Sequence, residues 1–493
     1  MSKLYNTLTK QNNTLDKKNI NIYICGPTVY DHSHIGHART YITFDIIRNI
    51  LTNYFKYNIH VTMNITNVDD KIINRTNENN KDKQLNFEDY LNYAKIYEES
   101  FFEDLMNLNV SKPNVITRVS DYIDEIILFI NKIIENKYAY ESNQSIYFDT
   151  AKFKEEYPEL SNPFNLKDTN DDKFKINDYA NKKKNKQDFV LWKAKKSEQE
   201  PSWNSPWGIG RPGWHIECSA MCHSINGDHL DIHCGGIDLQ FPHHNNEILQ
   251  THAYTLNNWT DHFMHFGHLN IQGLKMSKSL KNFITIKEIL NKYTPNQLRL
   301  LFLMHDWHTE MEYNESSMEY IINLDKRLVE FIDILNFYIK RQINDNEKYN
   351  DQDKQTNKLL EQLKSNIDNY LIDNINTKQV IIDINDFMSY VYNYIKDKPK
   401  SYVLNEILKY VNFILLCFGY KIKENNNNEV DKFIDVIANI RQDIRNITQN
   451  VKDNETKNKL FALTDNIRDK IMPKLNIQIT DDGKDNNIWR SIL

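Results

Sequence analysis

Residues 22–40 read IYICGPTVYDHSHIGHART, and this stretch decides the expected fold. It opens on the apolar run Ile22-Tyr23-Ile24, which is typical of a buried strand. Gly26-Pro27 breaks that strand, and His34-Ile35-Gly36-His37 then leads into a helical pattern of apolar residues. A strand, a glycine turn and a helix start together favour phosphate binding, because free N–H groups and the helix dipole attract anions. His34 and His37 are three residues apart and can face one side of the first helical turn.

A second short motif, Lys275-Met276-Ser277-Lys278-Ser279, lies far downstream. Taken alone, the two histidines are explained equally well by capping and solvent contact at a helix start, because short motifs recur by chance. HIGH followed by KMSKS, at the start and the end of one α/β unit, is much rarer. The pair resembles the signature of class I aminoacyl-tRNA synthetases.

The composition indicates a large globular protein. The 493 residues predict roughly three domains, and a chain with 40% hydrophobic and 26% charged residues is globular rather than disordered. The net charge of −6, from 61 basic and 67 acidic residues, argues against a generic nucleic-acid coat but is compatible with a local basic groove.

The number of cysteines and the hydropathy of the sequence indicate the cellular compartment in which the protein works. The five cysteines are sparse and odd in number, which suits a reducing environment. Residues 1–19 are polar and lack the apolar core of a signal peptide. Apolar runs such as Val411–Tyr420 are too short to cross a bilayer. We therefore expect a cytoplasmic protein with no membrane partner.

Strand and helix patterns alternate through the first part of the chain. Residues 20–75 read as strand, helix and strand, and Tyr138–Phe148 alternates like a further strand. Residues 77–87 are expected to form a polar loop. A helix is expected over 243–256, with Pro242 at its start, where proline is tolerated.

Together with the class I resemblance, these patterns predict an α/β fold. It would contain a Rossmann-like catalytic domain with an inserted connective segment, followed by a mainly α-helical anticodon-binding region. The expected parts are residues 1–137 (first half of the catalytic domain, with HIGH), 138–187 (connective insertion), 188–285 (second half, with zinc ligands and KMSKS), 286–345 (helical stem-contact region) and 346–493 (helical anticodon-binding region with a small C-terminal tail). The lysine-rich run at 182–186 is most simply a solvated loop, and contact with an RNA backbone is the less favoured interpretation.

Cysteine, histidine and glutamate side chains gather in the second half of the predicted α/β domain. Cys218 and Cys222 lie four residues apart on one predicted helix, and His243 and Glu247 have the same spacing on another. Thiolates, imidazole and a carboxylate form a ligand set for zinc. The competing interpretation is a group of buried, reduced cysteines beside two histidines at a helix start. Spacing alone does not choose among Cys218, Cys222 and Cys234 as ligands.

From residue 4 to about residue 310 the sequence resembles cysteinyl-tRNA synthetases, and the resemblance is loose beyond that point. The matching blocks are 4–9, 23–41, 64–72, 188–193, 210–221, 231–239 and 241–247, with Asp482-Gly483 and Trp489-Arg490 similar to the C-terminal end of the family. Three positions depart from the family pattern: Cys234 stands in place of the usual glycine, Asn245 in place of glutamate and Asn67 in place of aspartate.

The resemblance implies one zinc ion per chain, held by Cys25, Cys218, His243 and Glu247. Such an ion can tell cysteine from serine, because a coordinated thiol loses its proton easily whereas a hydroxyl is far more basic. Trp214 would close over the small substrate; an ordinary core tryptophan is the alternative.

The remaining site residues are also implied by the resemblance. The catalytic residues are expected to be His34, His37, Lys275 and Lys278. ATP, with its magnesium ion, is expected to contact Thr28, His34, His37, Gly235, Gly236, Asp238 and Lys278. The amino acid is expected to contact Gly26, Thr66 and Trp214. The implied partners are L-cysteine, ATP and tRNA(Cys), and we expect a monomer.

Two other functions remain open from the sequence. An ATP-dependent cysteine ligase acting on an amino-sugar would share the catalytic core and the zinc ligands but would lack a full anticodon-binding region. A non-catalytic zinc and nucleic-acid binding protein would not need intact HIGH and KMSKS motifs. The long helical part after residue 310 favours tRNA as the second substrate.

Overall fold

The computed structural model describes most of the chain and divides it into two compact units. The described residues are 1–81, 83–153, 160, 183–271, 273–275, 283–341, 349–397, 399–422, 428–475, 477–481 and 487–491. The first unit comprises Met1–Met318, Asn366–Ile381 and Cys417–Gly419, and the second comprises Glu319–Ser365, Ile382–Leu416 and Tyr420–Leu493. The finer division into five parts stays a prediction.

A five-stranded sheet organises the first unit. Its strands, in spatial order, are β11 (Thr260–Phe266), β10 (Leu230–Gly236), β3 (Asn19–Ile24), β4 (Asn58–Ile65) and β5 (Val115–Arg118). Every neighbouring pair is parallel. Ile22 pairs with Val61 on one side and with Ile232 on the other, so the apolar run 22–24 lies in the middle strand. The predicted α/β class is confirmed.

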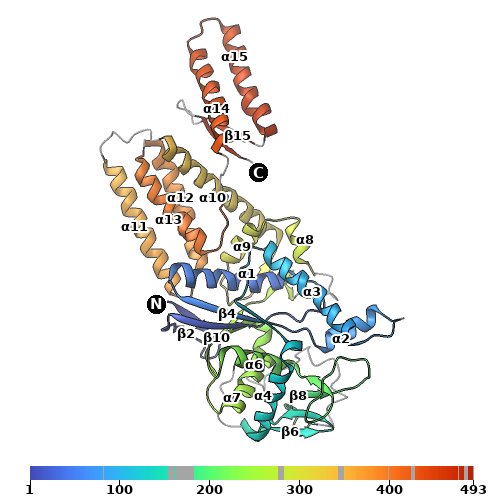
Figure 1. Ribbon diagram of the computed structural model, residues 1–493. Helices are drawn as coiled ribbons and strands as arrows, with labels where there is room; N and C mark the ends of the chain where they lie inside the picture. Colours follow the sequence, from blue (N-terminus) through green and yellow to red (C-terminus); the bar gives the residue numbers. More distant parts are fainter. Residues whose placement is uncertain are drawn as a thin grey trace. The chain divides into compact units, whose positions relative to one another are not determined.

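Helices cover both faces of this sheet (Figure 1). Helix α1 (Ile35–Asn49) lies on one face, and α4 (Ile123–Glu135), α6 (Trp214–Asn226) and α7 (Asn245–Thr255) lie together on the other. The apolar stripe of α4 explains this packing, because its buried residues join those of α6 in one hydrophobic cluster. Such double coverage is what a parallel sheet requires.

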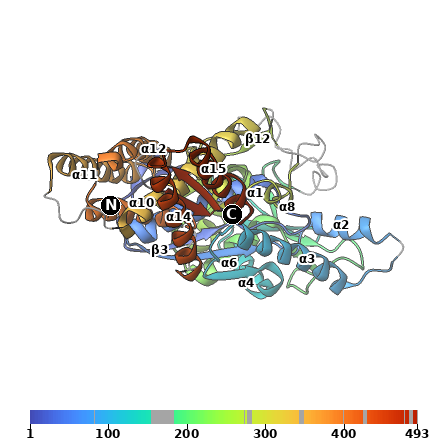
Figure 2. The same cartoon turned by 90° about the horizontal axis from the view of Figure 1, so that it is seen from above.

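Two helices next to the sheet show where the polar pattern misled the sequence analysis. Helix α2 (Asp70–Asn79) and helix α3 (Phe87–Asn107) run side by side (Figures 1 and 2). The expected polar loop over 77–87 is therefore wrong at its start, where residues 77–79 complete α2. The Asp69 side chain caps α2 by accepting a hydrogen bond from Lys71 N, a cap that offsets the polar composition of the helix.

The segment Tyr138–Phe148 is a hairpin rather than one strand. Strand β6 (Ala139–Ser142) turns into β7 (Ser145–Phe148), and both turn residues, Asn143 and Gln144, have positive φ angles. Strands β8 (Phe189–Ala194) and β9 (Gly210–Pro212) complete an antiparallel sheet in the order β6-β7-β8-β9. The start of the predicted insertion thus shares a sheet with the segment that follows it.

The helix expected over 243–256 begins later than predicted. Residues Gln240–His244 form an irregular turn in which Phe241 has extended angles, and α7 begins at Asn245. Pro242 therefore lies in this turn and not at the first position of the helix. Both His243 and Glu247 are still held at the start of α7.

Shorter strands form two further small sheets in the described part of the chain. Strands β1 (Lys3–Asn6) and β2 (Gln11–Thr14) form a hairpin that the polar sequence did not suggest. Strands β12 (Leu269–Ile271), β13 (Leu274–Lys275) and β14 (Met311–Tyr313) form a three-stranded sheet.

The rest of the chain is mainly helical, as predicted. The helices are α8 (Ile286–Leu290), α9 (Pro295–Leu303), α10 (Glu315–Arg341), α11 (Asp351–Ile372), α12 (Thr377–Tyr394), α13 (Ser401–Cys417), α14 (Asn428–Gln449) and α15 (Asn454–Asn466), followed by the pair β15 (Ile477–Asp481) and β16 (Asn487–Ser491). Within the described ranges, no helix combines the length and the apolar character needed to cross a bilayer.

Candidate metal centre and nucleotide site

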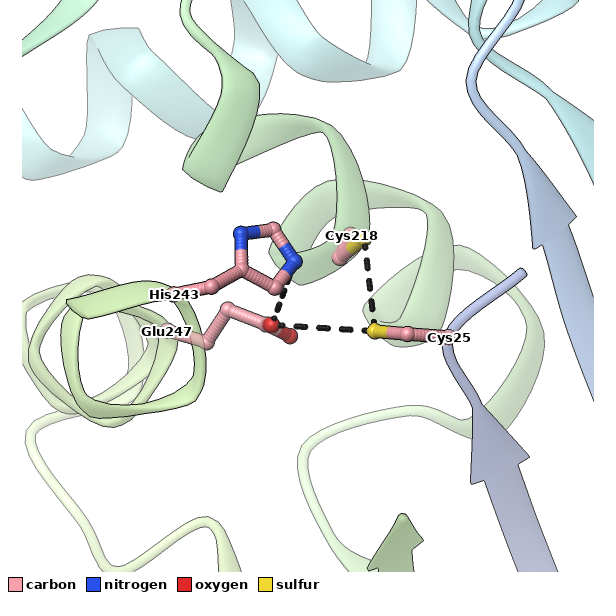
Figure 3. A group of neighbouring side chains, drawn as sticks. All are labelled: Cys25, Cys218, His243 and Glu247. Carbon is pink, nitrogen blue, oxygen red and sulfur yellow. Dashed lines mark hydrogen bonds and ion pairs between the residues drawn. The ribbon is translucent and has the colours of Figure 1, made fainter. Parts of the chain in front are cut away.

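Four side chains from three separate parts of the first unit meet at one buried point (Figure 3). Cys25 directly follows β3, Cys218 lies on α6, and His243 and Glu247 flank the start of α7. The Sγ atoms of Cys25 and Cys218 are 3.8 Å apart. Oε1 of Glu247 lies 3.9 Å from the Cys25 sulfur and 3.0 Å from Nε2 of His243. The structure thus brings together all four predicted metal ligands.

The sulfur–sulfur distance fits a tetrahedral zinc site, whereas the 3.0 Å between His243 Nε2 and Glu247 Oε1 is a hydrogen-bond distance. With Zn–S bonds of about 2.3 Å, two thiolates of a tetrahedron lie about 3.8 Å apart, and mixed sulfur, nitrogen and oxygen edges are about 3.4–3.6 Å. The 3.8 Å between the two sulfurs matches that edge. All four candidate ligand atoms lie within 4.8 Å of one another. The donor set and its spacing therefore suit the ion implied by the sequence.

A second overlapping group combines Cys25 and Glu247 with His233 and His244. We favour the first group because it offers two thiols, which select zinc more strongly. His233 instead touches Glu247 from outside that group: its Nε2 lies 3.1 Å from Oε2 of Glu247, while its Nδ1 lies 3.1 Å from the carbonyl oxygen of Tyr23. Such outer contacts orient the side chains that bind a metal.

The other two cysteines that spacing left open lie outside both groups. The sulfur of Cys222 accepts a hydrogen bond from Asn226 Nδ2 at 3.6 Å. The thiol of Cys234 donates to the carbonyl oxygen of Tyr23 at 3.7 Å. Both residues are fully buried, as expected for small apolar side chains.

Burial sets the protonation of the four side chains in the absence of a cation. It raises the pKa of the Cys25 thiol well above its ordinary value, raises the pKa values of Cys218 and Glu247, and lowers the pKa of His243 well below its ordinary value. The neutral forms are therefore favoured, and negative charge here calls for a positive partner. A metal ion is the usual one for a thiolate in such a setting.

Two residues of α6 pack directly on the predicted ligand His243. The Trp214 ring stacks on the imidazole with centroids 4.4 Å apart, and His215 Nδ1 lies 2.9 Å from His243 Nδ1. Trp214 is thus beside the metal group, where the sequence analysis expected a substrate contact. The contact with His215 was not foreseen, because it depends on how α6 packs against α7.

The HIGH motif forms the start of α1. His34 is the N-cap: its Nδ1 accepts from Gly36 N at 3.0 Å, and Nδ1 of His37 accepts from His34 N at 3.2 Å. The rings stack with centroids 3.9 Å apart. Since both Nδ1 atoms accept, the proton of each neutral ring sits on Nε2. Burial lowers the pKa of His37 to about 4, so at neutral pH this ring is an uncharged N–H donor suited to phosphate oxygen.

Close backbone approaches explain the predicted glycines. A Cβ at Gly26 would lie 1.8 Å from the carbonyl oxygen of Asn64, and one at Gly235 would lie 2.9 Å from the His244 ring. Thr28 and Thr66 pair through a parallel bridge between the loops after β3 and β4. Gly26 and Thr66, which are predicted to contact the amino acid, therefore lie in neighbouring loops, and Asn64 Oδ1 accepts from Gly26 N at 3.0 Å.

The structure describes only some of the remaining predicted residues. Asp238 is exposed and follows Gly235 and Gly236 at the carboxyl end of β10. Lys275 ends β13, and Lys278, with the rest of KMSKS, lies outside the described residues, as do Lys182 and Asp482-Gly483.

The departures from the family pattern leave the four candidate ligands untouched. Asn67 donates to Ser120 Oγ at 2.8 Å and accepts from Ser120 N at 3.1 Å, so it fixes a loop after β4. Cys234 and Asn245 are buried and belong to neither metal group.

Comparison with known proteins identifies the class to which this fold belongs. The family model described as "tRNA synthetases class I (C) catalytic domain" matches residues 11–323. The structure also resembles Mycobacterium tuberculosis methionyl-tRNA synthetase solved with methionyl-adenylate, at 13% identity and a TM-score of 0.61 over 86% of this chain and 94% of that one. A parallel sheet with HIGH after its middle strand, in this fold, defines a class I aminoacyl-tRNA synthetase.

Curated relatives narrow the class to one family. The Encephalitozoon cuniculi cysteine–tRNA ligase is 41% identical over 95% of this chain and 95% of its own length. The cytoplasmic cysteine–tRNA ligases of Dictyostelium discoideum and Homo sapiens are 38% and 34% identical over 95% and 97% of this chain, and 73% and 80% of their own lengths. The chain belongs to the cysteine–tRNA ligase family. It is therefore an aminoacyl-tRNA ligase whose substrates are an amino acid, ATP and tRNA.

Proposed function

We propose that the enzyme attaches L-cysteine to the 3′ end of tRNA(Cys), with one zinc ion held by Cys25, Cys218, His243 and Glu247. The observation that carries this proposal is the buried group of two thiols, an imidazole and a carboxylate, whose ligand atoms lie within 4.8 Å of one another and whose sulfurs are 3.8 Å apart. When bound, zinc supplies a soft Lewis acid that accepts the substrate's sulfur as a thiolate and holds a serine hydroxyl poorly. Discrimination of roughly 10⁴–10⁵, or about 5.5–7 kcal/mol, would make a separate editing site unnecessary.

The reaction has two steps. The carboxylate oxygen of cysteine attacks the α-phosphorus of ATP, and pyrophosphate leaves with the electron pair of the broken P–O bond. A ribose hydroxyl at the 3′ end of the tRNA then attacks the carbonyl carbon of cysteinyl-adenylate, and AMP leaves. Both steps need positioning and charge stabilisation more than covalent help.

The chain's own residues divide these tasks. His34 and His37 offer Nε2–H groups to phosphate oxygens from the start of α1. Lys275 and Lys278 neutralise the leaving pyrophosphate, for which magnesium is the further counter-ion. Thr28, Gly235, Gly236 and Asp238 complete the nucleotide site, while Gly26, Thr66 and Trp214 surround the amino acid.

The amino-sugar ligase is the rival function. It shares the core, so the helical region after residue 310 is the feature that favours tRNA. Three relatives that match at least 95% of this chain are named cysteine–tRNA ligases. We further propose that the enzyme is a cytoplasmic monomer, in line with the word "cytoplasmic" in the names of two of those relatives.

Cysteine-dependent pyrophosphate exchange, followed by charging of tRNA(Cys), tests the proposal. We expect exchange with cysteine, at most a trace with serine, and loss of exchange after zinc is stripped by a chelator. Exchange without charging, together with transfer of cysteine to an amino-sugar, would establish the rival. Equal activation of serine and cysteine would exclude the zinc-based selection.

A further inference from the structure

Glu217 is a buried carboxylate next to the metal group, and neither zinc binding nor phosphate binding uses it. Glu217 lies on α6 between Trp214 and Cys218, and 1% of its surface is exposed. Within the described part of the chain, its side chain receives a single hydrogen bond, from Thr66 Oγ1 to Oε2 at 3.4 Å. A buried carboxylate normally collects several donors or a cation, because taking its charge out of water is costly.

The cations near Glu217 are already engaged. Arg211 and Lys193 both act on its charge, but each is paired with Asp70: Lys193 Nζ lies 2.8 Å from Oδ2, and Arg211 contacts Oδ1. The charge of Asp69 is also near and has the same sign as that of Glu217. No ion pair among the described residues includes Glu217.

The single partner of Glu217 leads directly to the proposed amino acid site. Thr66 Oγ1 accepts from Asn64 Nδ2 at 3.3 Å, and Asn64 Oδ1 accepts from Gly26 N at 3.0 Å. Gly26 follows the ligand Cys25, and Cys218 follows Glu217. Glu217 is therefore joined through hydrogen bonds to the residues that would surround the substrate backbone, while the next residue on its helix would hold the metal.

An amino acid brings three groups to such a site: a side chain, a carboxylate that must reach ATP, and an ammonium. The proposed function assigns partners to the first two only. We propose that the Glu217 carboxylate binds the α-ammonium of the substrate, with Thr66 holding the second carboxylate oxygen. This assignment rests on the proposed function and adds a specificity residue to it. An ammonium supplies three donors and the missing positive charge, and a charge-assisted bond is stronger than a neutral one.

The test compares cysteine with 3-mercaptopropionate, which is cysteine without its amino group. In Glu217→Gln we expect the KM for cysteine in pyrophosphate exchange to rise on the order of 10–100-fold, since one charge-assisted bond is lost. The inhibition constant of 3-mercaptopropionate should stay within about threefold of that of the unmodified enzyme, because this ligand never had the bond. Zinc content and the KM for ATP should not change.

Glu200→Gln is the matched control. Glu200 is also buried, at 8% exposure, but accepts its hydrogen bond from Lys196 N in a loop apart from the metal group. Both ligands should bind this variant as they bind the unmodified enzyme. If Glu217→Gln does not fold, Glu217→Asp keeps the negative charge on a shorter side chain. This variant should bind cysteine more weakly and bind 3-mercaptopropionate as the unmodified enzyme does.

If Glu217→Gln weakened the binding of both ligands equally, or left cysteine binding unchanged, the proposed role of Glu217 would be overturned. An unmodified enzyme that does not activate cysteine would instead overturn the proposed function, and that failure is visible before any variant is made.

Discussion

Nε2 of His233 lies 3.1 Å from one carboxylate oxygen of Glu247, while Nε2 of His243 lies 3.0 Å from the other. The carboxylate is thus held between an imidazole from β10 and an imidazole from the turn before α7. His243 is a predicted metal ligand, whereas His233 would orient Glu247 from behind. The two histidines should therefore differ in how strongly their removal affects the metal.

His233→Ala should weaken zinc binding by roughly 10–100-fold, as for other residues that orient a ligand, without abolishing it. Competition with a chromogenic chelator measures the affinity. His262→Ala is the control. His262 is also buried and lies in the same sheet, on β11, but it belongs to neither metal group. Loss of all zinc from His233→Ala would instead make His233 a ligand and favour the second group.

Cys218→Ala should lower the zinc content and raise the KM for cysteine, because one of the two thiolates is removed. Cys222→Ala, one helical turn further along α6, should retain zinc, since its sulfur is outside both groups. Metal content by atomic absorption and exchange kinetics check the pair. The opposite pattern, with zinc lost only from Cys222→Ala, would mean that the wrong thiol was chosen.

The strand, turn and helix around HIGH could be predicted because apolar periodicity and glycine breaks act locally. The four candidate ligands could be named only with the help of the family resemblance, because spacing alone does not choose among Cys218, Cys222 and Cys234. The contacts that other side chains make with these ligands could not be predicted from the sequence. His215 and His233 reach His243 and Glu247 only through the packing of α6 and β10 against α7, and no spacing along the chain encodes that.

Polar elements were missed for a similar reason. Helix α2 and the β1–β2 hairpin are rich in asparagine, lysine and threonine, so they carry few of the apolar residues on which the prediction depends. The cap from Asp69 stabilises α2, and its buried Ile72 and Ile73 anchor it. These two apolar residues are adjacent and too few to define a helical stripe.

Lys278→Ala should slow adenylate formation by roughly 10²–10³-fold and leave zinc in place, because the lysine would stabilise charge that develops only in the transition state. Pyrophosphate exchange and metal content are measured on the same preparation. Lys287→Ala is the control: this exposed lysine on α8 pairs with Glu103 at 3.4 Å and should exchange normally. A normal exchange rate in Lys278→Ala would refute its role.

Asp104 on α3 should make stability depend on pH. The residue is 2% exposed, its Oδ1 finds no hydrogen-bond partner in the described part of the chain, and burial raises its pKa to about 6. A carboxyl whose pKa is higher in the folded state binds more protons when folded, so its ionisation destabilises the fold as pH rises from about 4 to 6. Asp104→Asn should therefore stabilise the protein by about 1–2 kcal/mol at pH 8, with residual solvent screening included.

The gain from Asp104→Asn should fall to about half at pH 5 and vanish below about pH 3, where the aspartate is protonated in both states. Asp89→Asn, on the same helix, provides a control of opposite sign, because hydrogen bonds from Lys83 and Asn86 lower the pKa of Asp89. That variant should lose stability at pH 8 and approach the unmodified protein in acid. Thermal midpoints across this pH range check both variants. A gain for Asp104→Asn that is the same at pH 4 and pH 8 would show that packing, and not the buried charge, is responsible.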